Sequence, residues 1–113
     1  MFRRLVAGLV LAISVGCATT GAVAPERIQA AESAIREAET AGASKLPEAT
    51  SYLQLARDEV EQGKQLSSSQ YGHQAEMMLQ RAGEDAKLAR ALTQKASLDA
   101  DVKEAGERLK TLQ

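Results

Sequence analysis

The stretch that decides the fold is QYGHQAEMMLQRAGEDAKLARALTQKASLDADVKEAGERLKTL, residues 70–112, which contains no proline. Ala, Glu, Gln, Lys, Arg and Leu supply most of it, and these side chains lose little rotamer freedom in a helix. Only Gly72, Gly83 and Gly106 weaken the pattern. We therefore predict one long helix, which would span about 65 Å at 1.5 Å per residue.

This helix carries two sets of apolar residues. The set in its first half is predicted to pack against other helices, and it comprises Tyr71, Ala75, Met78, Leu79, Ala82, Ala86, Ala89 and Leu92. The second set has spacings of four, three, four and three, and it comprises Leu98, Val102, Ala105, Leu109 and Leu112. These spacings form a heptad seam over two repeats, the pattern of a coiled coil. In a monomer this seam would have nothing to pack against, so we expect it to fray or to pair with another chain.

The chain before residue 70 predicts two shorter helices, each about 25 Å long. The first begins at Pro25, because proline is favoured in the first turn, and ends near Gly42, a typical residue after a helix end. Its apolar face comprises Ile28, Ala31, Ile35 and Ala38.

The second helix is predicted over residues 47–62, with Gly63 as the residue that ends it. Its apolar stripe comprises Ala49, Tyr52 or Leu53, Ala56 and Val60. The serines at 67–69 follow in the predicted turn, where their hydroxyl groups are suited to cap the N-terminus of the long helix.

Together these patterns predict an all-α fold in a chain of 113 residues, enough for one small domain. No segment alternates apolar and polar residues as a strand does. We expect a helical hairpin plus a long third helix over residues 26–97, a three-helix bundle with tetratricopeptide-like packing. Residues 98–113 are expected to extend the third helix beyond this bundle in a coiled-coil-like manner. A core lined with alanine buries little area per residue, so we expect marginal stability.

The N-terminal residues 1–16, MFRRLVAGLVLAISVG, have the pattern of a secretion signal peptide. Arg3 and Arg4 supply the positive start, and an apolar run follows at residues 5–15. That run is too short for a membrane-spanning helix, which needs about 20 apolar residues. We therefore expect these residues to direct export of the chain.

The only cysteine, Cys17, directly follows this segment. Residues 14–17, SVGC, resemble the lipobox of bacterial lipoproteins. The resemblance implies cleavage between Gly16 and Cys17, a diacylglyceryl group on the Cys17 thiol, and residues 17–25 as lipidated cysteine and flexible tether. Because Ala18 is not Asp, it also implies the outer membrane. The alternatives are an ordinary cleaved signal with a free cysteine and an uncleaved anchor.

The helical part resembles a family of small helical domains, the domain of unknown function four-three-nine-eight. The resemblance rests on Gly42-Ala43, Pro47-Glu48, Tyr71 in a turn, and DAKLA at residues 85–89, and it covers roughly residues 26–96. It implies a secreted or lipidated protein of Gram-negative bacteria. It supplies no catalytic residue.

The polar residues offer few candidates for chemistry. His73 and Glu76 share a helix face, but a metal site would need more ligands. Met77 and Met78 are interpreted as core filler rather than ligands of a soft metal. The carboxylate pairs Glu84-Asp85 and Asp99-Asp101 are expected on solvated helix faces. We therefore expect no enzyme, no metal and no cofactor.

The function that these patterns favour is that of a lipoprotein anchored in the outer membrane through lipid on Cys17 and facing the periplasm. It would act as a non-enzymatic structural or interaction module, with an envelope protein or a second copy on its C-terminal helix. With a net charge of −1 and no basic stripe, the chain offers nothing to nucleic acid.

Two alternatives are a small ligand- or metal-binding helical bundle and a coiled-coil envelope spacer. Such spacers have longer uninterrupted heptads and a terminal lysine, whereas this sequence ends in Thr111-Leu112-Gln113.

Overall fold

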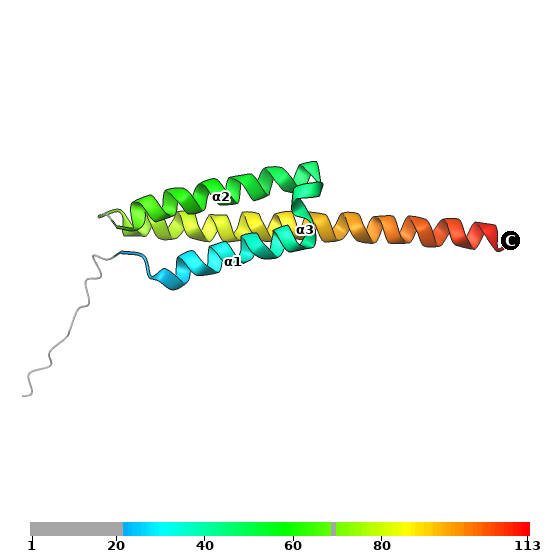
Figure 1. Ribbon diagram of the computed structural model, residues 1–113, viewed down its shortest axis with the longest axis horizontal. Helices are drawn as coiled ribbons and strands as arrows, with labels where there is room; N and C mark the ends of the chain where they lie inside the picture. Colours follow the sequence, from blue (N-terminus) through cyan, green and yellow to red (C-terminus); the bar gives the residue numbers. More distant parts are fainter. Residues whose placement is uncertain (1–21, 69) are drawn as a thin grey trace, which may run out of the picture.

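The computed structural model describes residues 22–68 and 70–113, which contain three α-helices and no strand (Figure 1). In chain order they are α1 (Pro25–Ala41), a short 3-10 helix η1 (Ala43–Lys45), α2 (Pro47–Ser67) and α3 (Gly72–Thr111). The first half of α3 packs on both α1 and α2, and its second half projects beyond them. The prediction of an all-α bundle with a long third helix is confirmed.

The bounds of α1 follow from its two terminal residues. Pro25 occupies the first turn, where the missing N–H costs no hydrogen bond. Gly42 adopts a left-handed conformation, with φ 97°, and its N–H donates to the carbonyl oxygens of Ala38 and Glu39. A side chain is disfavoured at this backbone conformation, so the predicted glycine stop is confirmed.

The connector between α1 and α2 closes one end of the bundle. Thr50 Oγ1 donates to the carbonyl oxygens of Ala43 at 3.1 Å and Leu46 at 3.0 Å. Ala43 is fully buried, and a Cβ atom on Gly42 would lie 3.8 Å from Thr93 Cγ2. The connector therefore sits beside Thr93 and marks where α3 leaves the bundle.

The predicted end of α2 at Gly63 is wrong, because the helix continues to Ser67. Gly63 is buried against α3, and a Cβ atom there would lie 2.8 Å from Leu79 Cγ and 3.4 Å from the Ala75 carbonyl oxygen. The glycine thus serves the close approach of α2 and α3 rather than a turn.

The predicted serine cap on α3 is wrong for Ser67 and Ser68, which end α2, while Ser69 lies outside the described residues. The residue before α3 is Tyr71, which makes no side-chain cap hydrogen bond. Ser67 belongs to the last turn of α2, where its Oγ donates to the Lys64 carbonyl oxygen at 2.7 Å. Because α2 is longer than expected, its own end uses this hydroxyl group.

The core consists mainly of alanines, with Ile35, Leu53, Val60 and Leu79 as its larger members. The predicted apolar faces are confirmed, with Ile28 and Tyr52 at the half-buried edge, except that Tyr71 was expected to pack in the bundle and is exposed because it lies in the turn before α3. The buried apolar residues are Ala31, Ile35, Ala38, Ala43, Ala49, Leu53, Ala56, Val60, Ala75, Leu79, Ala82, Ala86 and Ala89. Small side chains let the helices approach closely, but each contributes little buried area.

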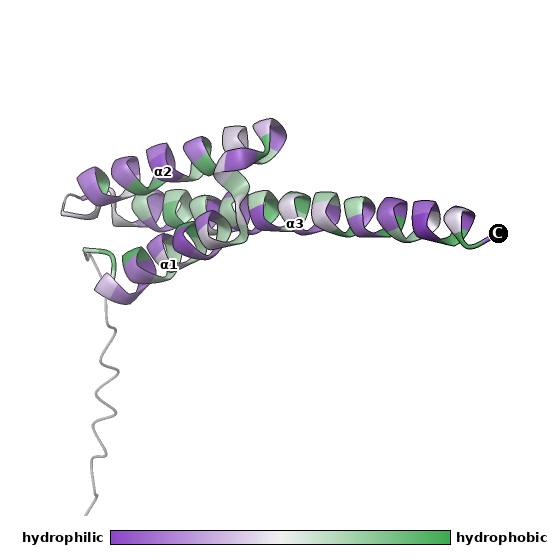
Figure 2. Cartoon of the chain, turned by 45° about the vertical axis from the view of Figure 1, so that its right-hand side comes forward, coloured by the Kyte–Doolittle hydropathy of each residue, from purple (hydrophilic) through white to green (hydrophobic). Residues whose placement is uncertain are grey.

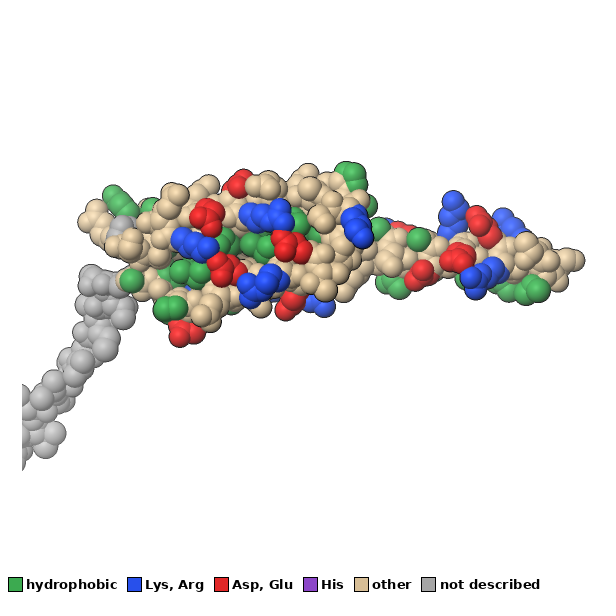
Figure 3. All heavy atoms as spheres, viewed as in Figure 1, with side chains coloured by type: hydrophobic (Ala, Val, Ile, Leu, Met, Phe, Trp, Pro, Cys, Tyr) green, Lys and Arg blue, Asp and Glu red, His purple; other side chains and the backbone are tan. Residues whose placement is uncertain are grey.

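Ion pairs join the helices around this core. Lys64 Nζ lies 2.6 Å from Glu32 Oε1, between α2 and α1, and Arg90 Nη1 lies 2.7 Å from Glu37 Oε2, between α3 and α1. Figure 3 shows acidic and basic side chains flanking a strip of hydrophobic ones on this face of the bundle. Exposed pairs each contribute at most about 1 kcal/mol, so apolar packing remains the main stabilising interaction.

Residues 94–113, here called the overhang, extend past the bundle. Every residue in this range is exposed except Gly106, which is half-buried. The helical part, residues 94–111, is about 27 Å long at 1.5 Å per residue. In the described ranges, no helix combines the length and hydrophobicity needed to cross a membrane.

Candidate functional site

The first candidate site is the seam formed by Leu98, Val102, Ala105, Leu109 and Leu112 on the overhang. Its large side chains are among the most exposed apolar groups in the described residues, at 64% for Leu98, 72% for Val102, 64% for Leu109 and 83% for Leu112. Figure 2 shows hydrophobic ribbon continuing along the overhang to its end. The seam lies where the sequence predicts it and is uncovered.

The seam does not continue the face of α3 that packs in the bundle. At 100° per residue, it is rotated by about 140° from the buried residues, which include Ala82 and Ala86. Leu88, which is 40% exposed, also lies on the outer side of α3, but about 80° from the seam by the same rotation.

A shallow groove runs along the seam and has charged edges. It is lined by Asp101, Glu104, Ala105, Arg108, Leu109 and Leu112. The side chains of Asp101 and Arg108 are seven residues apart, so they lie on the same edge two turns from each other. Arg108 pairs with Glu104, whereas Asp101 forms no ion pair within the described residues. The small side chain of Ala105 leaves the middle of the groove open.

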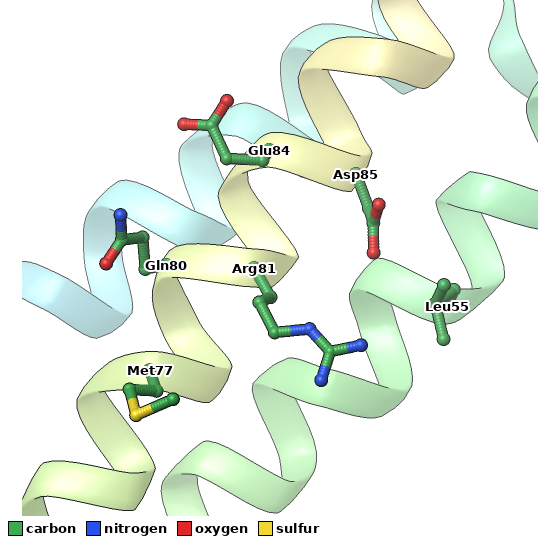
Figure 4. A pocket seen from close by; sticks show the side chains of 6 residues that line it. All are labelled: Leu55, Met77, Gln80, Arg81, Glu84 and Asp85. Atoms are coloured by element: carbon green, nitrogen blue, oxygen red, sulfur yellow. The ribbon is translucent and has the colours of Figure 1, made fainter.

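The second candidate site is a carboxyl pair between α2 and α3. Glu59 of α2 is only 3% exposed, and its Oε1 lies 3.2 Å from Arg81 Nη2, with which it forms an ion pair. Its Oε2 has no hydrogen-bond partner in the described part of the chain. Figure 4 shows Arg81 and Asp85 extending from α3 toward α2, while Glu84 points away.

The surroundings of Glu59 raise its pKa. Burial is the largest cause, followed by the negative charge of Asp85 and a hydrogen bond with Asp85, whereas the positive charge of Arg81 acts in the opposite direction. A protonated Glu59 carboxyl can donate to the Asp85 carboxylate, which satisfies an otherwise unpaired buried oxygen. The pair therefore holds a proton more tightly than an isolated glutamate does.

This pair corrects one expectation from the sequence. Glu84 is exposed as expected, but Asp85 is half-buried and faces Glu59 rather than solvent alone. The missed signal lies in α2, where Glu59 is three residues after buried Ala56 and four before Gly63. Once the helix is extended through Gly63, that spacing places Glu59 on the buried face.

The other polar candidates do not come together. His73 is exposed, and Glu76 pairs with Arg27 at 3.1 Å. Met77 is 52% exposed, and Met78 is half-buried at the bundle edge. Across residues 22–68 and 70–113, no group of three or more His, Cys, Asp and Glu side chains is arranged to hold a metal ion.

The predicted lipidation and cleavage residues, Cys17 and Gly16, lie outside the described residues. The described chain enters α1 at Pro25, at the end of the bundle opposite to the overhang (Figure 1).

Comparison with known proteins identifies the domain but no function. A family described as Domain of unknown function (DUF4398) matches residues 26–105, which include the whole bundle, the carboxyl pair and the seam as far as Ala105. No curated protein and no solved structure matches the chain. Because the family match spans more than half of the sequence, the chain belongs to the DUF4398 family.

Proposed function

We propose that this protein is a lipoprotein of the outer membrane that faces the periplasm and acts as a non-enzymatic interaction module. Lipid on Cys17 would hold the chain to the membrane, and the seam on the overhang would bind a protein. The observation that carries this proposal is the exposed apolar seam at one end of the molecule, combined with the cysteine on the chain that enters at the other end.

The sequence before the bundle supports the anchor. A positive start, a short apolar run and SVGC at residues 14–17 resemble the signal of a bacterial lipoprotein. One acyl chain binds a bilayer only weakly, whereas two or more hold a protein firmly. A multiply acylated Cys17 would therefore attach the chain without a transmembrane helix.

The shape of the described chain supports the interaction role. The overhang points away from the Pro25 end of the bundle, where a membrane-attached segment would arrive (Figure 1). An anchored molecule would thus hold the seam away from its point of attachment. Exposed apolar patches on helices commonly mark protein–protein contacts.

Mass spectrometry of the protein purified from bacterial membranes tests the anchor. We expect a mature chain that begins at Cys17 and carries the mass of diacylglyceryl and acyl groups. Cys17→Ser should remove this mass and release the protein from the membrane fraction. A chain cleaved at another residue, or a Cys17 without lipid, would contradict the proposal.

Membrane sorting provides a matched control at the neighbouring residue. By resemblance to bacterial lipoproteins, Ala18→Asp should keep the lipid but retain the protein in the inner membrane. Density separation of inner and outer membranes measures this shift. If wild type and Ala18→Asp both fractionate with the inner membrane, the outer-membrane location is wrong while the anchor stands.

A further inference from the structure

We propose that the seam binds the seam of a second copy of this chain in antiparallel orientation, with Leu98 opposite Leu109 of the other copy. This inference rests on the interaction role proposed above and names the partner. Its grounds are the side-chain sizes along the seam, the charges at its edge and the length of the overhang.

The side-chain sizes fit one antiparallel register. Val102 and Leu109 occupy a positions of the heptad, and Leu98, Ala105 and Leu112 occupy d positions. Antiparallel helices place each a position opposite a d position. When Leu98 meets Leu109 of the second copy, Val102 meets Ala105, and symmetry repeats both layers. The Val102 side chain then fills the groove left open beside Ala105.

The charged edge fits the same register. Asp101 and Arg108 lie on one side of the seam, and antiparallel pairing brings Asp101 next to Arg108 of the second copy, twice by symmetry. In a parallel pair, Asp101 would face Gly106 instead. The two Lys95 side chains would also meet at an a position, where like charges repel. Charge therefore favours the antiparallel arrangement.

The length of the overhang also fits antiparallel pairing with Leu98 opposite Leu109 of the second copy. In this register Leu112 of one copy lies beside Lys95 of the other, just past Thr93, where α3 leaves the bundle. Each overhang thus covers the whole of the other, and the two bundles remain at opposite ends. The Lys95 stem can pack along the apolar surface while its Nζ stays bonded to Asp99 Oδ2, at 2.6 Å.

A membrane surface fits the overhang less well. Its basic and acidic side chains are equal in number, so no net charge attracts it to anionic lipids. The basic residues are Lys95, Lys103, Arg108 and Lys110, and the acidic ones are Asp99, Asp101, Glu104 and Glu107. A seam of two heptads is short, so we expect weak pairing in solution.

Disulfide trapping tests the register in the full-length protein purified in mild detergent. Leu98→Cys and Leu109→Cys variants carrying different tags are mixed, oxidised and analysed by mass spectrometry of the linked peptides. We expect links mainly between residue 98 of one variant and residue 109 of the other. Links of 98 to 98 and 109 to 109 would show a parallel pair. Ala100→Cys, on the opposite face of the overhang, should form no link.

Sedimentation over a concentration series tests whether the seam causes the pairing. Ala105→Glu places a carboxylate in the central layer, and we expect it to weaken dimerisation by at least about tenfold. Ala100→Glu is the matched control, because each substitution places a glutamate one helical turn from one basic and one acidic side chain. These neighbours are Lys103 and Glu104 for residue 100, and Arg108 and Asp101 for residue 105. The control should dimerise within about twofold of wild type. Equal effects of the two variants would overturn the proposal.

A charge exchange tests the orientation independently. Asp101→Arg should weaken the dimer by about tenfold, because two attractive contacts become repulsive. The double variant Asp101→Arg, Arg108→Asp restores opposite charges across the pair and should recover most of the affinity. A single variant that pairs as wild type does would overturn the antiparallel register.

The outcomes separate this inference from the proposed function. A wild-type chain that stays monomeric, with crosslinks from position 105 to a different envelope protein in cells, would overturn self-pairing and leave the interaction module intact. Binding to phosphatidylglycerol vesicles that Ala105→Glu abolishes would assign the seam to a membrane instead and overturn both. An unlipidated Cys17 in a chain that still dimerises would remove the anchor alone.

Discussion

The two halves of α3 have the same helical backbone and opposite surroundings. In the first half, small residues such as Ala82 and Ala86 are fully buried between α1 and α2. In the second half, large residues such as Leu98 and Leu109 are exposed. Most buried positions in the first half of α3 are alanine, which lets the helices approach closely, with Leu79 as the one large buried side chain in this half.

The two halves also depend on different interactions. The first half is stabilised by burial against two other helices, and by ion pairs such as Arg90 with Glu37. The second half has local pairs, Lys95 with Asp99 and Arg108 with Glu104, each four residues apart. Local pairs contribute only about 0.2–0.5 kcal/mol each, so a change of the same kind should affect the two halves very differently.

The largest difference in stability is expected when one leucine in each half of α3 is replaced by alanine. Leu79→Ala leaves a cavity in the core and should lower the free energy of unfolding by about 2–5 kcal/mol. Leu98 is 64% exposed, so Leu98→Ala should change the free energy of unfolding of the monomer by less than about 0.5 kcal/mol. Urea unfolding at low protein concentration measures both. Equal losses would show that the overhang is covered in the monomer.

The next effect is expected from Gly63, which packs on the first half of α3, and from Gly106, which lies in the second half. Gly63→Ala would place a Cβ atom 2.8 Å from Leu79 Cγ, so we expect a loss of about 1–3 kcal/mol in the free energy of unfolding. Gly106 has no such neighbour within 4 Å, and Gly106→Ala should stabilise the helix by up to about 1 kcal/mol.

The double variant Gly63→Ala, Leu79→Ala isolates the cause of the first loss. If contact with Leu79 causes the loss of stability in Gly63→Ala, adding Gly63→Ala should lower the free energy of unfolding much less in the Leu79→Ala background than in wild type. Additive losses would place the cause elsewhere, for instance at the Ala75 carbonyl oxygen.

The carboxyl pair gives the first half of α3 a pH dependence of stability in the acidic range. Because the pKa of Glu59 is higher in the folded chain than the ordinary value of 4.5, the folded state binds more protons above that pH. The stabilising effect of protonation is therefore present at acidic pH and is lost as pH rises through the folded-state pKa.

Glu59→Gln should remove this dependence. An amide keeps a donor for Asp85 without a charge, so we expect a gain of about 1 kcal/mol at pH 7 that disappears near pH 4. Thermal unfolding across that range measures it, with exposed Glu84→Gln as the control. A loss of stability at pH 7 would mean that the Glu59 charge, paired with Arg81, stabilises the fold.

The smallest effect is expected within the overhang itself. Asp99→Asn removes the ion pair with Lys95 and should lower the stability of this helical segment by less than about 0.5 kcal/mol. Amide hydrogen exchange of residues 94–111 measures the change, and exchange in α1 should stay the same. A matching change in α1 would mean that the overhang unfolds together with the bundle.

The sequence by itself determined which segments are helical and where most of them begin and end. Pro25 and Pro47 start helices because their missing N–H is not needed in a first turn, and Gly42 stops α1 because it accepts a positive φ. Periodicity also identified the seam, since the residues on one side of a helix recur every three or four positions. These are local properties of the chain.

Only the tertiary structure decided how the remaining residues are used. Gly63 lies inside α2, where it allows the close approach of Leu79, and buried Glu59 lies beside half-buried Asp85 because α2 and α3 pack together there. Leu88 stays exposed because α1 and α2 cover the other sides of α3. Each of these roles depends on a neighbour distant in sequence, which local spacing does not specify.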